Sequence, residues 1–364
     1  MTTAPGPATQ AATLTAQQAP AQPSELVVRR ANLLRALSAV PGWLGLADSL
    51  SIPTGGDLFQ EAAALTTDQH YRLMSQVEPR LKPEPLENGA FRPVLGPSDV
   101  GVYPVLTPAQ RQQLADRAIS VGRIEVAASG PFHLRGTGFV VGPDLVATNC
   151  HVLESIGSLD GGQWRFSNDT RIDFGEGPTH DDTLEYRVVG VRAMSHTAGL
   201  DVALLDVEAT SISGGLPLPA ALPFRQSALA YDWALSGLPI ALVGYPNLDG
   251  ATSNLRDLAK TGAYAKIFAP GLAVGGLRLA GVDVIAHIAG TAEGNSGSPI
   301  FDLDAFEVIA VHNCCLGTPA SSLQGLACSQ ITVAQEAQNQ AVASWAAAGD
   351  ETIGPFLRRD VPAR

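Results

Sequence analysis

Ser296 stands in the segment EGNSGSPIFD, residues 293–302, between two glycines and directly before a strand-like run. A serine on such a tight turn suits a nucleophile, because Gly294 lets the chain bend until backbone N–H groups point at one spot. The amides of Gly294 and Ser296 are therefore candidates for an oxyanion hole, and Gly297 leaves space beside a reacting carbonyl. The alternative is an ordinary Gly-Ser turn.

A serine hydroxyl needs a neighbouring base to become a good nucleophile. His151, at the end of the strand-like segment LVATNC, is the candidate base, although a lone histidine also fits a hydrogen-bonded core residue. Asp201 is the candidate third member, because it opens the apolar segment VALLDV, where a carboxylate is costly unless an imidazole pairs with it. Its rival, Asp206, ends that segment, as a turn residue would.

The three residues follow one another in the order His151, Asp201, Ser296. This is the order of the chymotrypsin arrangement, and other hydrolase folds use different orders. The segments GTGFVVGPDLVATNCHVL, LDVALLDV and GNSGSPIFD resemble the three catalytic blocks of trypsin-like serine peptidases. The similarity is greatest to the bacterial branch that includes the glutamyl endopeptidases, and it covers about residues 107–347.

The resemblance implies a mainly β fold of two antiparallel six-stranded barrels, with the site in the cleft between them. It also implies a serine endopeptidase that acts on a protein or peptide substrate without a cofactor. Ser296 would attack the scissile carbonyl, His151 would carry the proton to the leaving amine, and Asp201 would orient His151.

Thr291 and His312 occupy the places that contact an acidic substrate side chain in glutamyl endopeptidases. A protonated imidazole would complement that charge. Alternatively, His312 is a common feature of its strand with no selective role. Two departures from the family pattern bear on this choice, because 313–315 (Asn-Cys-Cys) replace expected glycines and Glu293 would repel an acid if it pointed inward.

Two other functions stay open from the sequence. A catalytically silent binding or scaffold module on the same fold is one, and the complete set of three residues argues against it. An esterase with the same residues is the other, but the chain lacks the G-x-S-x-G context and residue order of the α/β-hydrolases.

The elements that must position these residues begin at about Ser120, where short strand-like runs are separated by Gly, Pro, Asn or Asp. Closely spaced strands without long helices predict an antiparallel barrel or sandwich. Upstream, apolar periodicity predicts a small helical domain, and Pro108 after Thr107 opens a further helix. The predicted order is a disordered tail (1–24), a helical domain (25–82), a Pro/Gly-rich linker (83–106), the peptidase domain (107–347) with a final helix over 333–348, and a tail (348–364).

No IVGG-like sequence precedes the segment VGRIEV, so activation by a newly cleaved N-terminus is not expected. The enzyme is therefore either constitutively competent or controlled by its N-terminal region, with 25–82 as the place for a regulatory partner. The plainer alternative is a stabilising extension of the barrels.

The composition excludes several classes. With 45% hydrophobic residues the chain can bury a core, and a net charge of −12 argues against a nucleic-acid partner. Residues 1–24 carry no charge and no long apolar run, and no later stretch is apolar enough to span a membrane, so a cytoplasmic protein is expected.

The remaining histidines and the four cysteines get no catalytic role. In a reducing cytosol all cysteines are thiols, whereas in an exported protein Cys314 or Cys315 would bridge to Cys328. Cys150 is expected to be buried, on the strand face opposite His151. No metal site is expected from the spacing of histidine and cysteine. The histidines predicted to be surface or hydrogen-bonded residues are His70, His133, His180, His196 and His287.

Overall fold

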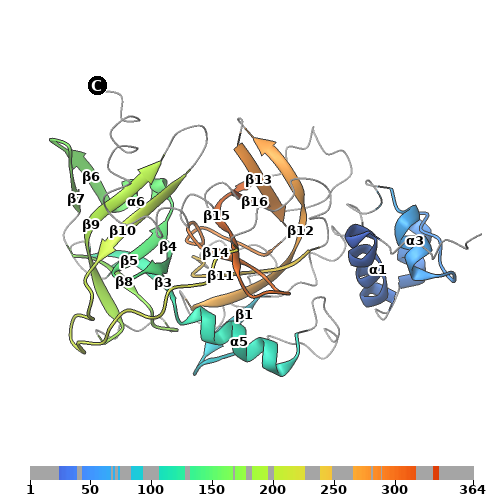
Figure 1. Cartoon of the computed structure of the whole chain (residues 1–364), viewed down its shortest axis with the longest axis horizontal. Coiled ribbons are helices and arrows are strands. Elements are labelled where there is room, and N and C mark those ends of the chain that lie inside the picture. Colours follow the sequence, from blue (N-terminus) through green and yellow to red (C-terminus); the bar gives the residue numbers. More distant parts are fainter. Residues whose placement is uncertain are drawn as a thin grey trace, which may run out of the picture.

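Antiparallel strands are the main regular structure of the described residues, and helices are fewer and short (Figure 1). The structure is a computed structural model. It describes residues 24–38, 43–66, 69, 73, 83–92, 106–127, 132–166, 169–177, 183–195, 201–225, 238–247, 265–279, 282–287, 289–316 and 331–335.

The first β unit is a closed barrel of six strands in the order β10-β5-β4-β3-β8-β9, and all its pairings are antiparallel. Apolar side chains such as Ile124, Val140 and Val146 fill its interior. A short helix and a hairpin lie between β5 and β8. This unit confirms the prediction of a mainly β fold with a six-stranded barrel. Its elements are β3 (Val121–Ala127), β4 (Phe132–Gly142), β5 (Leu145–Thr148), α6 (Cys150–Ile156), β6 (Gly157–Asp160), β7 (Gln163–Phe166), β8 (Thr170–Asp173), β9 (Glu185–Ser195) and β10 (Val202–Val207).

The second β unit is an eight-stranded sheet in the order β11-β14-β15-β16-β13-β12-β1-β2. Because β11 also pairs with β12, each of the six strands β11 to β16 has a paired neighbour on both sides. The hairpin β1–β2 is attached to this set through the pairing of β1 with β12. The second six-stranded barrel stays a prediction. The strands are β1 (Glu84–Glu87), β2 (Ala90–Phe91), β11 (Pro239–Gly244), β12 (Ile267–Leu279), β13 (Val282–His287), β14 (Pro299–Asp302), β15 (Val308–Leu316) and β16 (Ile331–Gln335).

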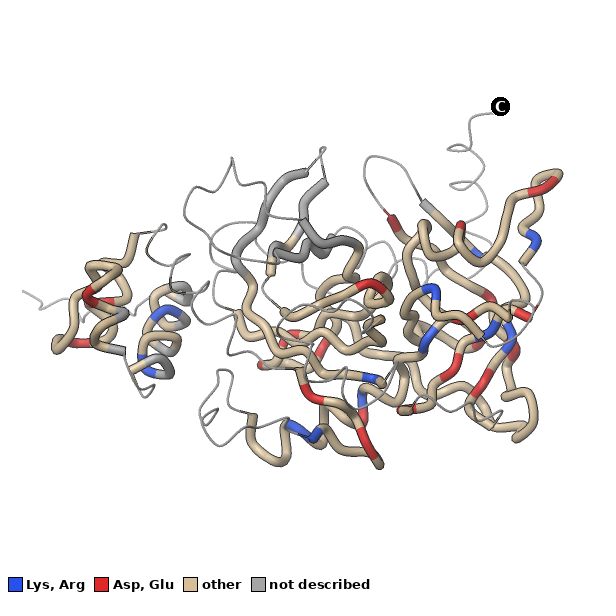
Figure 2. Tube along the Cα trace, turned by 180° about the vertical axis from the view of Figure 1, so that it is seen from behind, with Lys and Arg blue, Asp and Glu red and all other residues tan. Residues whose placement is uncertain are grey.

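The predicted N-terminal helices are present as α1 (Glu25–Ser38), α2 (Trp43–Ser49) and α3 (Leu58–Ala64). Arg30 of α1 donates a hydrogen bond to the carbonyl of Leu65, just after α3, at 2.9 Å. Figures 1 and 2 both show α1 and α3 at the end of the molecule farther from the closed barrel. After Thr66, only Gln69 and Leu73 of the predicted helical domain belong to the described residues.

The segment predicted as a linker contributes to the second β unit. Its residues 83–92 include the hairpin β1–β2, and β1 pairs with β12. Glu84 of β1 forms a two-point ion pair with Arg111 of the following helix, α5 (Pro108–Ala118). Thr107 caps α5 through a capping box with Gln110, as the Thr-Pro start predicts. The domain boundaries themselves stay a prediction.

The predicted final helix differs from the structure at its start. Residues 333–335 belong to β16, which pairs with β13 on one side and β15 on the other. Two neighbouring strands satisfy its backbone, and this tertiary pairing outweighs the helical preference of an Ala- and Gln-rich sequence. The later part of that helix lies outside the described residues.

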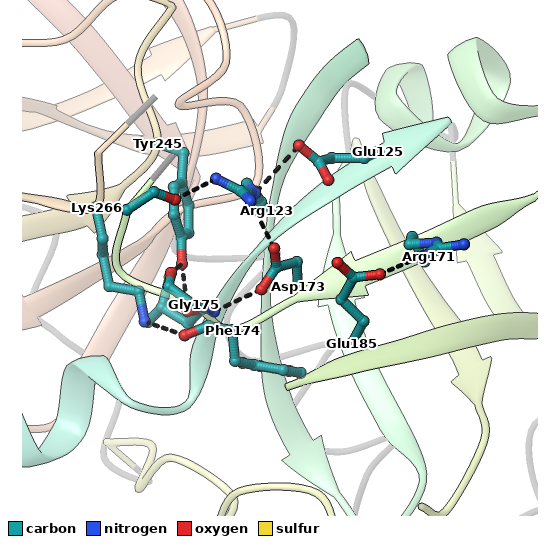
Figure 3. A network of polar contacts seen from close by, with 11 residues as sticks. Arg123, Glu125, Arg171, Asp173, Phe174, Gly175, Glu185, Tyr245 and Lys266 are labelled. Atoms are coloured by element: carbon teal, nitrogen blue, oxygen red, sulfur yellow. Dashed lines mark hydrogen bonds and ion pairs between the residues drawn. The ribbon is translucent and has the colours of Figure 1, made fainter. Parts of the chain in front are cut away.

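A buried polar network joins the two β units (Figure 3). Arg123 of β3 pairs with Asp173 at 2.6 Å and with Glu125 at 3.1 Å. From the second unit, Lys266 donates to the carbonyls of Ala118 and Phe174, and the Tyr245 hydroxyl donates to the carbonyl of Gly175. The segment after β8 is therefore held by side chains of both units. Burial lowers the pKa of Lys266 to about 7, against the opposing effect of Glu176 and Asp173.

Acidic and basic residues occur together along the closed barrel (Figure 2). Arg171, for example, pairs with Glu185 and Asp169. Among the described residues, no helix is long and apolar enough to cross a bilayer.

Candidate active site

His151 and Asp201 are in direct contact. His151 Nδ1 lies 2.6 Å from Asp201 Oδ2, and the His151 backbone N–H donates to Oδ1 at 3.1 Å. The side chain of Asn149 donates to the Asp201 backbone carbonyl at 2.7 Å, so the start of α6 and the start of β10 are fixed to each other. These bonds orient the imidazole ring against the carboxylate.

The strand predicted to carry His151 is shorter than expected. β5 ends at Thr148, and Cys150 and His151 open α6. Cys150 is buried and donates through sulfur to the carbonyl of Val202, so its burial was predicted correctly but its assignment to a strand was wrong. The first N–H groups of a helix have no acceptor within the helix, which explains why the His151 amide can donate to Asp201.

Asp201 is kept ionised by its surroundings. Burial alone would raise the pKa of this carboxyl group. The hydrogen bond and charge of His151, together with the backbone N–H groups of His151 and Cys150, hold the pKa below its ordinary value. A carboxylate that stays charged can stabilise a positive imidazolium beside it.

Asp206, the rival third member, has a different partner. Arg192 of β9 binds its carboxylate at 2.6 and 2.8 Å. The structure therefore brings Asp201, and not Asp206, to His151.

Two glycines with positive φ shape the loop that carries Ser296. Gly294 has φ 92° and Gly297 has φ 88°, a region that favours glycine. A Cβ at Gly294 would lie 2.5 Å from the carbonyl oxygen of Tyr245, so the close approach of the chain also excludes a side chain. Among the described residues, the amides of Gly294 and Ser296 donate no hydrogen bond, and they remain available to an incoming oxygen.

The Ser296 loop packs against the strands that lead to His151. A Cβ at Gly297 would overlap the Thr137 carbonyl oxygen of β4 and Thr148 Oγ1 at the end of β5. No hydrogen bond joins the Ser296 hydroxyl to His151, although both residues are described. Such bonds are often long in enzymes without substrate.

His312 of β15 lies next to the loop. Its backbone accepts from the Gly297 amide at 2.8 Å and donates to the Ser298 carbonyl at 2.9 Å. Its side chain is buried, and Nδ1 has no hydrogen-bond partner among the described residues. Burial, together with the charge of His151, lowers the pKa of His312 to about 3. The free imidazole is therefore neutral, whereas the family resemblance had suggested a protonated ring.

The other residues of the predicted pocket differ in exposure. Thr291 is fully buried and Glu293 is exposed. Asn313 is half-buried, and the side chains of the two cysteines after it lie outside the described part of the chain.

His287 was not assigned to the site from the sequence. The structure buries it beside His312, with ring centroids 5.7 Å apart. Burial, with the charge of His312, lowers the pKa of His287 well below its ordinary value. Side chains two residues apart on a strand point to the same face, so the apolar Ile285 was a sequence signal that His287 of β13 faces inward.

No metal cluster lies in the described ranges, since no three His, Cys, Asp or Glu side chains there could hold an ion together.

Residues 136–311 match the trypsin-like peptidase domain family. No curated protein matches the chain. Among solved structures, it is similar to the active form of the Rv3671c protease from M. tuberculosis, with 22% identity over 68% of this chain and 92% of that chain and a TM-score of 0.40. It is also similar to a Glu endopeptidase (17% identity, 62% of this chain, 87% of that chain, TM-score 0.39) and to a serine endoprotease from Yersinia pestis (15%, 66%, 65%, TM-score 0.42).

The family match spans most of both β units, including His151 and Ser296. Residues 136–311 therefore form a trypsin-like peptidase domain, and the protein is a serine endopeptidase, a hydrolase of peptide bonds in protein or peptide substrates.

Proposed function

We propose that Ser296, His151 and Asp201 form the catalytic triad of this endopeptidase. Ser296 Oγ bonds to the scissile carbonyl carbon while His151 takes the hydroxyl proton. The C–N bond then breaks, His151 passes the proton to the leaving amine, and water hydrolyses the acyl-enzyme by the same steps. The contact of 2.6 Å between His151 Nδ1 and Asp201 Oδ2 is the observation that carries this proposal, because it orients the base.

The backbone N–H groups of Gly294 and Ser296 form the oxyanion hole. Both amides are available in the free enzyme, and the positive φ of Gly294 supports the turn that aims them at one point. Donors fixed before the reaction stabilise the charge that develops on the carbonyl oxygen without further reorganisation.

His312 and Thr291 favour an acidic side chain on the acyl side of the scissile bond. Support comes from the burial of both residues and from the two backbone bonds that tie His312 to the Ser296 loop. A neutral imidazole can donate one hydrogen bond to a carboxylate, and the carboxylate would in turn raise the pKa of the ring. Because the ring of His287 packs against the ring of His312, the His312 imidazole would keep a fixed orientation.

The region 25–82 regulates the peptidase, through contacts with a partner protein. Its support is the chain path, since the helices precede a hairpin that pairs with β12 of the second β unit. Removal of 25–82 would then change the rate of labelling at Ser296, and an unchanged rate would favour a merely stabilising extension. A cytoplasmic location stays a prediction from the sequence.

A fluorophosphonate probe tests the proposed chemistry, because it reacts with an activated serine and needs no knowledge of the natural substrate. The wild-type chain should take up one probe at Ser296, and Ser296→Ala should take up none. A correctly folded wild-type protein that stays unlabelled would instead be a silent module on the same fold.

A further inference from the structure

Thr137, a fully buried residue of β4, hydrogen-bonds to both sides of the candidate active site. Its backbone N–H donates to the Ser296 carbonyl at 2.8 Å, and its hydroxyl donates to the Gly294 carbonyl at 2.8 Å. The Tyr245 amide donates to the same hydroxyl at 3.1 Å, and Thr148 donates to the Thr137 carbonyl at 2.8 Å. One residue of the closed barrel therefore holds the loop of the nucleophile and the strand that leads to His151.

The direction of a backbone N–H is set by the carbonyl in the same peptide unit, because the unit is planar and trans. The Gly294 amide shares a unit with the Glu293 carbonyl, which accepts from Asn247 N–H. The Ser296 amide shares a unit with the Asn295 carbonyl, which accepts from Ser298 N–H at 2.9 Å. The unit between them carries the Gly294 carbonyl, which accepts from the Thr137 hydroxyl at 2.8 Å, and the Asn295 N–H, which donates to the Ala292 carbonyl at the longer distance of 3.2 Å.

The unit held by Thr137 is the one that links the two amides of the oxyanion hole. A glycine at position 294 allows the backbone to rotate with little steric resistance. If this unit rotated, the amides before and after it would no longer converge on one oxygen. The bond from Thr137 opposes that rotation.

The direction of the Thr137 hydroxyl is itself fixed. A threonine hydroxyl has one hydrogen to donate, and here its oxygen accepts from Tyr245 while its hydrogen points at Gly294. Tyr245 is in turn bound through its own hydroxyl to Gly175 in the network of Figure 3. The network between the units therefore extends to the Ser296 loop through two further hydrogen bonds, from the Tyr245 N–H to Thr137 and from Thr137 to the Gly294 carbonyl.

We propose that Thr137 is a positioning residue of the oxyanion hole, whose hydroxyl keeps the amides of Gly294 and Ser296 directed at the same point. The inference rests on the proposed function of Ser296. It predicts a loss in the chemical step and little change in ground-state binding, since the oxyanion exists only after attack.

The test compares Thr137→Val with Thr137→Ser. Valine keeps the shape and removes the hydroxyl, whereas serine keeps the hydroxyl and removes the methyl group. Hydrolysis of p-nitrophenyl acetate gives kcat and KM, and the fluorophosphonate probe gives the rate of reaction at Ser296. Thr137→Val should lower kcat and the labelling rate by about tenfold to a hundredfold with KM nearly unchanged, somewhat less than the loss of a donor itself. Thr137→Ser should stay within about threefold of wild type.

Thr170→Val is the matched control, because Thr170 is a buried threonine of the same barrel on β8. It should lower the melting temperature without lowering kcat. If Thr137→Val does not fold, Thr137→Ser against Thr137→Ala decides the question, since both lack the methyl group and only one has the hydroxyl.

Each outcome separates this inference from the proposed function. Probe uptake that depends on Ser296 but is equally fast in wild type, Thr137→Val and Thr137→Ala would overturn the role of Thr137 and leave the nucleophile in place. Equal losses in the serine and alanine variants would also overturn it, because they would assign the effect to packing. A wild-type protein that takes up no probe would overturn both.

Discussion

Two buried polar regions of this molecule differ in how their side chains are paired. Between the β units, Arg123 has acidic partners and Lys266 has two carbonyl acceptors. Under the Ser296 loop, both side-chain polar atoms of Asn295, the hydroxyl of Ser298 and Nδ1 of His312 are buried without a hydrogen-bond partner among the described residues. The Ser296 loop thus has more buried polar atoms without a hydrogen bond than the network between the units. The two regions are nevertheless connected, because Tyr245 of the network donates to Thr137, which donates to Gly294.

The difference indicates what each region does. An unpaired polar atom in the interior lowers stability by about 1–3 kcal/mol, so it persists only where water, a ligand or a reaction uses it. The paired network fixes the two units relative to each other. The Ser296 loop, which we propose carries the nucleophile, keeps buried polar atoms at a cost in stability.

The largest expected effect comes from the loop. Ser296→Ala should abolish peptide hydrolysis with the fold intact, because the change removes only the attacking oxygen. His151→Ala should cause nearly the same loss, and the double variant should be no worse than either single one, since the two residues act as one unit. Cleavage of a peptide library by purified variants measures this. A double variant far slower than both single variants would argue against a triad.

Asp201→Asn should lower kcat by about four orders of magnitude, because an amide favours the wrong tautomer of His151. Asp206→Asn is the matched control, as its carboxylate binds Arg192 instead. It should change stability slightly and leave kcat near wild type. Steady-state kinetics with the two variants decides between them, and a crippling Asp206→Asn would reverse the assignment.

A smaller effect is expected at His312. Substrates with Glu on the acyl side should be cleaved at least about a hundredfold faster than those with Gln, since a site built for one polar group rejects an analogue that leaves it unpaired. His312→Ala should reduce this ratio while Ser296 is still labelled. A library profile led by Arg, Lys or small apolar residues would refute the acidic preference.

The same pocket should respond to pH. The pKa of His312 is about 3 in the free enzyme, and a bound carboxylate raises it, so binding of Glu favours proton uptake. The ratio of kcat/KM for Glu over Gln should therefore fall as the pH rises above about 4.3, where the free substrate carboxylate is ionised and binding takes up a proton. In His312→Ala the ratio should be independent of pH.

The smallest effect on catalysis is expected in the network between the units, where the change is in stability. Lys266 has a pKa of about 7 in the folded chain against an ordinary value of 10.5, so the unfolded chain binds more protons between these limits. Its contribution to the free energy of unfolding should rise with pH over this window, by up to about 1.4 kcal/mol per pH unit. Urea unfolding of wild type and Lys266→Met at several pH values measures the difference, and identical slopes would show that Lys266 does not titrate there.

Much of the closed barrel and the site was predictable from local sequence. Local signals for the site are the two glycines of the Ser296 loop, Gly294 and Gly297, and the apolar run after Asp201. The start of α5 was predicted from Thr107 followed by Pro108. The strand β12 was not foreseen, because Pro270 and several glycines interrupt it. The fold requires Gly271 there, since a Cβ would lie 2.8 Å from Ala289.

Other features depend on partners far away in the sequence. Alternation along β13 indicates that His287 faces inward, but no local pattern predicts that it packs beside His312, or that Lys266 reaches the carbonyls of Ala118 and Phe174. The hydroxyl of Thr137 gains its role only because Gly294 is folded against it. Such contacts follow from the topology of the two units, which the family resemblance supplied and the residue pattern alone did not.

The pairing of β1 with β12 affects how the chain is made. Glu84 leaves the ribosome long before its partner Phe268, so this part of the sheet forms only when synthesis of the second unit is well advanced. A shortened protein that starts at Thr107 would leave the paired end of β12 as an open edge strand, which is a template for aggregation. A truncated form of the peptidase that is to stay folded in solution should therefore begin before residue 83, even though the residues proposed as catalytic all lie after residue 150.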